Sequence, residues 1–134
     1  EYPASGRTGG AEALLTRLQD SEIVVERMLS HVPGGFVATG HSYGSLIALI
    51  LGGAEIILPE GLSSPPQHRK TQAVIAMSPS PYMPVLNQSY LNIKVPVLVQ
   101  TGSEDKFFNT QGEERTGPED HLQPFYELKP LGSH

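Results

Sequence analysis

The sequence predicts an α/β fold, with a mostly parallel sheet and flanking helices. Short apolar runs that do not alternate with polar residues are typical of strands covered on both faces of a parallel sheet. Three such runs occur, and two stretches with helical patterning precede or separate them. The expected order is helix 16–31, strand 36–39, helix 45–51, strand 73–77 and strand 95–101. The 134 residues are expected to form one domain or part of one.

The first helix is predicted from apolar residues at positions i, i+3, i+4 and i+7, which share one helix face. These residues are Val25, Met28, Leu29 and Val32, after an earlier apolar side made by Leu14, Leu15 and Leu18. Its start is marked by the capping-box spacing of Thr16 and Gln19, with Asp20 as an alternative cap. Pro33 and two glycines end the helix. Residues 1–11, rich in glycine, are expected to be irregular.

The next two elements form a strand followed directly by a helix. Residues 36–39 are a β-prone apolar run between glycines. Residues 45–51 are almost entirely apolar and are closed by Gly52 and Gly53, which is typical of a buried helix with a glycine stop. The pattern therefore predicts a strand, a short turn and a buried helix in succession.

Two further strands are predicted later in the chain. Residues 73–77 form an apolar run that ends in Ser-Pro, and residues 95–101 form another that ends at a glycine. Pro96 stands near the start of the latter strand, where a missing N–H group is tolerated. Residues 102–124 are polar and uneven, and Phe125–Leu128 are at most a weak strand between two prolines.

Composition excludes several classes of protein and site. Charged residues make up 17 % of the chain, too few for a coiled coil or a charge-driven disordered chain. The net charge of −5 offers nothing to attract nucleic acid or an anionic membrane surface, and no apolar run is long enough for a membrane span. Without cysteine there is no disulfide or thiolate nucleophile, and no histidine pair has the spacing of a metal site. We therefore expect no nucleic-acid partner, no membrane span and no metal.

The chemistry is carried by a G-x-S-x-G pattern in the five residues Gly40–Gly44. The pattern alone is weak evidence, and its expected context is a buried strand before it and a helix after it. Both are predicted here. On such a turn the serine is strained and exposed, with glycines on either side because side chains there would clash. Ser42 is the predicted nucleophile, and the N–H of Tyr43 at the helix N-terminus is the predicted oxyanion donor. The alternative is a plain glycine-rich turn with a surface serine.

At this motif the chain resembles the α/β-hydrolase superfamily, and most of all its dienelactone-hydrolase-like and platelet-activating-factor-acetylhydrolase-like esterases. The resemblance also covers Ala73–Pro79, similar to a family strand that ends in Ser-Pro, and Val95–Asp105. In such hydrolases a V-P-V-L strand leads into a T-G-x-x-D turn whose aspartate orients the catalytic histidine. The resemblance therefore implies that Asp105 is the acid of a Ser-Asp-His triad, in the Ser…Asp…His order of these folds.

The residues themselves support the same acid. Asp105 follows the C-terminal end of a predicted strand, at the edge where open α/β sheets keep their sites, and Ser42 is expected on that edge. Glu104 is the alternative acid. A serine alcohol also needs a histidine base, and the chain contains five histidines: His31, His41, His68, His121 and His134. His134 and a base beyond the present C-terminus are the two candidates kept open.

The resemblance implies a single partial α/β-hydrolase domain over residues 1–134, with the N-terminal strands and the last strand missing. It implies carboxylic ester hydrolysis in the parent protein, through a triad and an acyl-enzyme intermediate, on a small-molecule ester and without a cofactor. The 134 residues alone are expected to show little turnover. The alternatives are a catalytically incompetent fragment or binding protein, and a thioesterase or amidase on the same fold. The region of Tyr82, Met83, Val85, Leu86, Tyr90 and Leu91 is interpreted either as an acyl-pocket wall or as a core helix.

Overall fold

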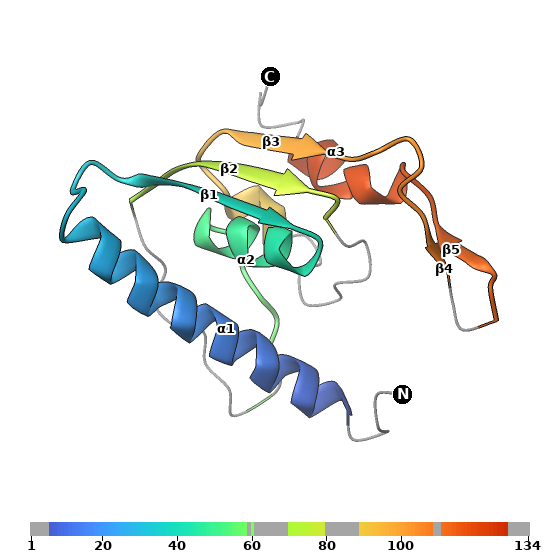
Figure 1. The fold of residues 1–134 in the computed structure, drawn as a ribbon, viewed down its shortest axis with the longest axis horizontal. Coiled ribbons are helices and arrows are strands. Elements are labelled where there is room, and N and C mark those ends of the chain that lie inside the picture. The colour runs from blue at the N-terminus through green and yellow to red at the C-terminus, as the bar shows by residue number, and fades with distance from the viewer. Residues whose placement is uncertain (1–5, 59, 61–69, 80–88, 109–110, 129–134) are drawn as a thin grey trace.

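The computed structural model describes residues 6–58, 60, 70–79, 89–108 and 111–128. The elements follow in chain order as α1 (Gly6–Leu29), β1 (Phe36–His41), α2 (Tyr43–Leu51), β2 (Thr71–Met77), η2 (Ser89–Asn92), β3 (Val97–Gln100), β4 (Phe107–Phe108), β5 (Glu114–Thr116), η3 (Asp120–Leu122) and α3 (Gln123–Leu128). Figure 1 shows them along the chain. None of the helices among these residues is long and apolar enough to cross a membrane.

A parallel sheet with strand order β1-β2-β3 forms the centre of the fold, so the predicted α/β class is confirmed. The helix α2 connects β1 to β2, as a crossover between parallel strands requires. The register pairs His41 with Met77 and Met77 with Gln100, so the three strands end level with one another. Whatever follows each strand therefore meets at one carboxyl edge.

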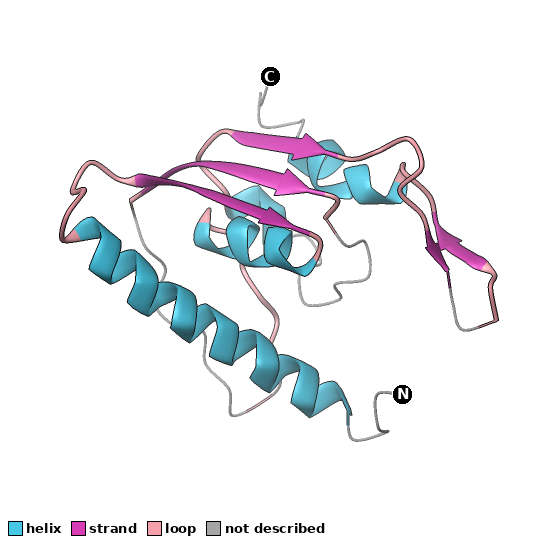
Figure 2. Ribbon diagram, viewed as in Figure 1, coloured by secondary structure: helices cyan, strands magenta, loops and turns pink. Residues whose placement is uncertain are grey.

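The hydrophobic core lies on one face of this sheet. It is built around Leu18 of α1, Leu49 of α2 and Val74 of β2, all almost fully buried. Figure 2 shows α1 and α2 on the same side of the strands. Val37 and Leu98 are 50 % and 57 % exposed, so the prediction of strands buried on both faces is wrong for the described residues. No helix among them covers the second face.

The first helix begins earlier than the sequence predicted. It starts at Gly6, so the capping box is wrong, and the Thr16 hydroxyl instead donates to the Glu12 carbonyl at 3.0 Å inside the helix. The predicted buried face is only partly confirmed, because Val25 is buried whereas Met28 and Val32 are exposed. α1 runs alongside the edge strand β1 (Figure 1), so the end of its apolar face reaches past the sheet.

The C-terminal part also differs from the prediction. Residues 123–128 form the helix α3 instead of a weak strand. Pro124 lies in its first turn, where a missing N–H costs nothing, and Leu128 packs into the core. The polar stretch before it contains the antiparallel pair β4–β5, with Lys106 and Glu114 in an ion pair at 3.2 Å. Strands of two or three residues are too short to leave a periodic signal.

Candidate functional site

The turn between β1 and α2 holds its serine in a rare backbone conformation. Ser42 has φ 52° and ψ −119°, and the residue is exposed. A positive φ is uncommon outside glycine and costs on the order of 1–3 kcal/mol. The N–H of Ser42 donates to the Met77 carbonyl at 2.9 Å, which ties the turn to the neighbouring strand. The hydroxyl makes no capping hydrogen bond to α2, so the serine is not an ordinary helix cap.

The two glycines of the motif are not equivalent. A Cβ on Gly40 would collide with the backbone of Gly44 and with the amide nitrogen of Ser45. The chain turns back on itself here so sharply that only hydrogen fits. A Cβ on Gly44 would meet nothing within 4 Å. The expectation that both glycines avoid a clash is therefore confirmed for Gly40 and wrong for Gly44.

The helix α2 begins directly after the serine, at Tyr43. The backbone N–H groups of a first helical turn carry partial positive charge and favour a nearby anion. The hydroxyl and N–H of Ser45 both donate to the Ser42 carbonyl, which holds the turn closed. Arg17 of α1 lies over the Tyr43 ring, 5.3 Å from its centroid. Tyr43 is the first residue of α2 and follows Ser42 directly, so its N–H is one of these first-turn groups. Its role as the oxyanion donor stays a prediction.

Asp105 lies at the same carboxyl edge, beyond β3. Its side chain is 25 % exposed, and its Oδ2 accepts a hydrogen bond from the Thr101 hydroxyl at 2.9 Å. The Ser78 hydroxyl, then the Thr101 hydroxyl and nearby His121 lower the pKa of Asp105 below its usual range despite its partial burial. Glu104 next to it is exposed. The geometry therefore favours Asp105 over Glu104 as the acid.

One histidine approaches that carboxylate. His121 is 7 % exposed, its Nε2 lies 3.7 Å from Asp105 Oδ1, and its Nδ1 is 2.9 Å from the Pro79 carbonyl oxygen. The Nδ1 is within hydrogen-bond distance of the Pro79 carbonyl, whereas the buried Nε2 has no hydrogen-bond partner and lies 3.7 Å from the Asp105 carboxylate. No contact among the described residues joins His121 to Ser42, so the structure pairs this histidine with Asp105 and not with the serine.

The other histidines are accounted for differently. His31 ends the α1 region with its Nδ1 2.9 Å from the Arg27 carbonyl, as expected for a side chain at a helix C-terminus. His41 is exposed at the end of β1. His68 and His134 lie outside the described residues. The choice of His134 or a base beyond the C-terminus therefore stays a prediction.

Sequence reasoning missed the role of Ser78 and did not single out His121. Ser78 has φ 46°, and its N–H donates to the Gln100 carbonyl at 2.7 Å. Its only sequence signal is its place between a strand and a proline. His121 is 16 residues from Asp105 along the chain, and no spacing rule connects the two.

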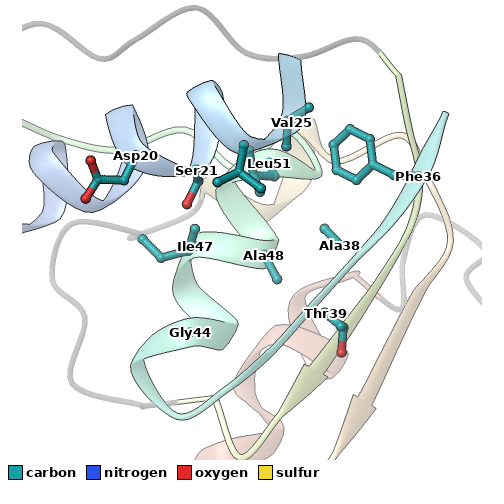
Figure 3. Close-up of a pocket in the computed structure, with 11 residues that line it drawn as sticks. Asp20, Ser21, Val25, Phe36, Ala38, Thr39, Gly44, Ile47, Ala48 and Leu51 are labelled. Carbon is teal, nitrogen blue, oxygen red and sulfur yellow. The ribbon is translucent and has the colours of Figure 1, made fainter. Parts of the chain in front are cut away.

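A pocket of about 330 Å³ lies between α1, β1 and α2 (Figure 3). Most of its lining is apolar, including Val25, Phe36 and Ile47, while Asp20 and Ser21 lie on α1. It contains Gly44 of the turn but not Ser42. The acyl wall proposed around residues 82–91 is described only from residue 89 onward, where Tyr90 is buried in the core. Leu91 beside it is 45 % exposed, so the core interpretation is supported for Tyr90 alone.

In the part of the chain that the structure describes, no three histidine or acidic side chains are grouped to hold a metal ion. No family model, curated protein or solved structure matches this chain. At the carboxyl edge of the parallel sheet, Ser42 and Tyr43 follow β1 and Asp105 follows β3.

Proposed function

We propose that the protein containing this chain is a serine hydrolase that cleaves carboxylic esters. The backbone of Ser42 is the observation that carries the proposal. This exposed serine has φ 52° between a parallel strand and a helix, and its hydroxyl does not cap the helix. Gly40, two residues earlier, has no room for a side chain. A strained strand-to-helix turn of this kind exposes the serine oxygen at the top of the sheet. A simple surface serine needs neither the strain nor the crowded glycine.

The mechanism uses the residues of the carboxyl edge. The Ser42 oxygen attacks the ester carbonyl carbon while a histidine accepts its proton, and the Tyr43 N–H donates to the oxyanion. Collapse of the intermediate expels the alcohol, which takes the proton from the histidine. The same histidine then takes a proton from water, which attacks the acyl-enzyme. The carboxylic acid product is released, and the proton returns to the Ser42 oxygen. Asp105 holds that histidine in the required tautomer. The candidate bases are still His134 and a histidine beyond the present C-terminus.

A serine-directed fluorophosphonate tests the nucleophile. Incubation with the protein, followed by peptide mass spectrometry, is expected to place the phosphonate on Ser42. Hydrolysis of p-nitrophenyl acetate is expected to disappear in Ser42→Ala with little change in melting temperature. Ser103→Ala removes an exposed serine from the turn after β3 and serves as the matched control.

The outcomes separate the competing functions. Turnover that survives in Ser42→Ala contradicts the assignment of the nucleophile. Labelling of Ser42 with hydrolysis of a thioester or an anilide, but not of the matching oxygen ester, identifies a thioesterase or an amidase. A protein that contains an intact base yet shows neither labelling nor turnover is a non-catalytic member of this structural class, and the proposal is then wrong.

A further inference from the structure

The turn after β2 holds a second serine in the left-handed region, and the proposed mechanism gives it no role. Ser78 has φ 46° and is followed by Pro79. A residue before proline is normally pushed toward extended conformations, so this backbone is unfavourable for two reasons. Glycine would relieve the strain at no steric cost. A serine at this place therefore indicates that its hydroxyl has a use.

That hydroxyl reaches Asp105. The middle strand β2 separates β1 from β3, so Ser78 stands at the carboxyl edge between Ser42 and the turn that carries Asp105. The N–H of Ser78 donates to the Gln100 carbonyl at 2.7 Å, which anchors the residue on β3. From this anchored position its hydroxyl is the largest cause of the lowered pKa of Asp105. Thr101, the residue after β3, donates to Oδ2 of the same carboxylate at 2.9 Å.

We propose that Ser78 is a positioning residue, whose hydroxyl holds the Asp105 carboxylate toward the middle strand and so toward the side on which Ser42 lies. The inference rests on the proposed function, because the orientation of Asp105 matters to catalysis only if this carboxylate holds the histidine that serves Ser42. The Thr101 hydroxyl already donates a hydrogen bond to Asp105 Oδ2. A second hydroxyl donor, from Ser78, would restrict the carboxylate to one orientation. Ser78 acts through Asp105 and does not itself take part in the reaction.

Few charged groups lie near Asp105 among the described residues. His121 faces Oδ1 at 3.7 Å, Glu104 beside it is exposed, and Lys106 forms an ion pair with Glu114 at 3.2 Å. The Ser78 hydroxyl is the largest cause of the lowered pKa of Asp105, ahead of Thr101 and His121. The ionisation of Asp105 therefore offers a direct readout of the Ser78 contact.

Three substitutions separate the hydroxyl of Ser78 from its backbone strain. Ser78→Ala removes the hydroxyl and keeps the strain, and Ser78→Gly removes both. Ser78→Thr keeps the hydroxyl and increases the strain, because a β-branched residue is poorly suited to a positive φ. Thermal melting measures stability, and carbon-13 NMR titration of the Asp105 carboxyl measures its pKa. Ser103→Ala, in the same edge region, is the control.

The pKa of Asp105 is expected to rise in Ser78→Ala and Ser78→Gly and to stay as in the wild type in Ser78→Thr and Ser103→Ala. Stability is expected to follow a different order, with the glycine variant above the alanine variant and the threonine variant lowest. In the active protein, kcat is expected to fall about tenfold in the alanine and glycine variants with little change in KM, because the lost bond is to a charged group. If the role of Ser78 is purely structural, kcat and the pKa of Asp105 will instead follow the order of stability, with the largest change in the threonine variant.

The two proposals fail separately. If the pKa of Asp105 moves as expected but the wild type hydrolyses no ester and Ser42 is not labelled, the proposed function is overturned and the Ser78–Asp105 contact is supported. If turnover depends on Ser42 while Ser78→Ala and Ser78→Gly leave both kcat and the pKa of Asp105 unchanged, the positioning role is overturned and the hydrolase proposal stands.

Discussion

His121 places its Nε2 3.7 Å from Oδ1 of Asp105, although the two residues belong to different segments of the chain. The other ring nitrogen of His121 lies 2.9 Å from the Pro79 carbonyl, so one imidazole joins the turn after β2, the turn after β3 and the segment before α3. The Thr101 hydroxyl donates a hydrogen bond to the same carboxylate, and the Ser78 hydroxyl lowers its pKa. The carboxyl edge of the sheet is thus held together around one ionised aspartate.

His121 is expected to stabilise the C-terminal part of the fold. Replacing it with phenylalanine removes the ring nitrogens and leaves the buried Pro79 carbonyl without this partner, which costs about 1–3 kcal/mol. The free energy of unfolding in urea measures the loss. His31→Phe changes an exposed histidine and is expected to shift stability by about 0.5 kcal/mol or less. Equal effects in the two variants would show that the contact of His121 contributes nothing.

Asp105 is expected to make stability depend on acid pH. Its pKa is lower in the folded protein than the value of 3.8 expected for the unfolded chain. The stabilisation is therefore fully present above the unfolded pKa and is lost as the pH falls through the folded pKa. Asp105→Asn should be less stable than the wild type near pH 7, and the difference should shrink toward pH 2. Urea midpoints across this range give the comparison, and Glu104→Gln at an exposed neighbour should keep the wild-type profile.

The two glycines of the motif are expected to respond in opposite ways to alanine. Gly40→Ala forces a Cβ into the backbone of Gly44 and is expected to destabilise the fold by at least about 3 kcal/mol. Gly44→Ala adds a Cβ in open space near the start of α2, where alanine is the better helix former, and stability should stay within about 1 kcal/mol. Chemical unfolding of both variants checks this contrast. A tolerated Gly40→Ala would show that the turn is wider than described.

The strained backbone of Ser42 is expected to lower the free energy of unfolding. Ser42→Gly relieves the positive φ and should raise the free energy of unfolding by about 1 kcal/mol, while it removes the proposed nucleophile. Ser21→Gly, inside α1, should instead destabilise by a similar amount, since glycine is a poor residue in a helix interior. Melting temperatures measure both changes. If Ser42→Gly also destabilises, the backbone of the turn is not strained.

The sequence by itself determined the parallel α/β class, the strand–turn–helix around Ser42 and the place of Asp105 after a strand. These features depend on local patterns: unalternating apolar runs, glycine stops and the close approach that makes Gly40 necessary. It did not determine the early start of α1 at Gly6, because tertiary packing of Leu14 and Leu18 outweighs the weak helix propensity of glycine.

Only the tertiary structure decided what surrounds Asp105. Ser78 and His121 meet it because parallel strands of matching register bring their carboxyl ends to one edge, and α3 folds back so that Leu128 reaches the core. The physical reason is that a hydrogen bond to a carboxylate depends on positions in space, and residues distant along the chain leave no periodic signal of such a meeting.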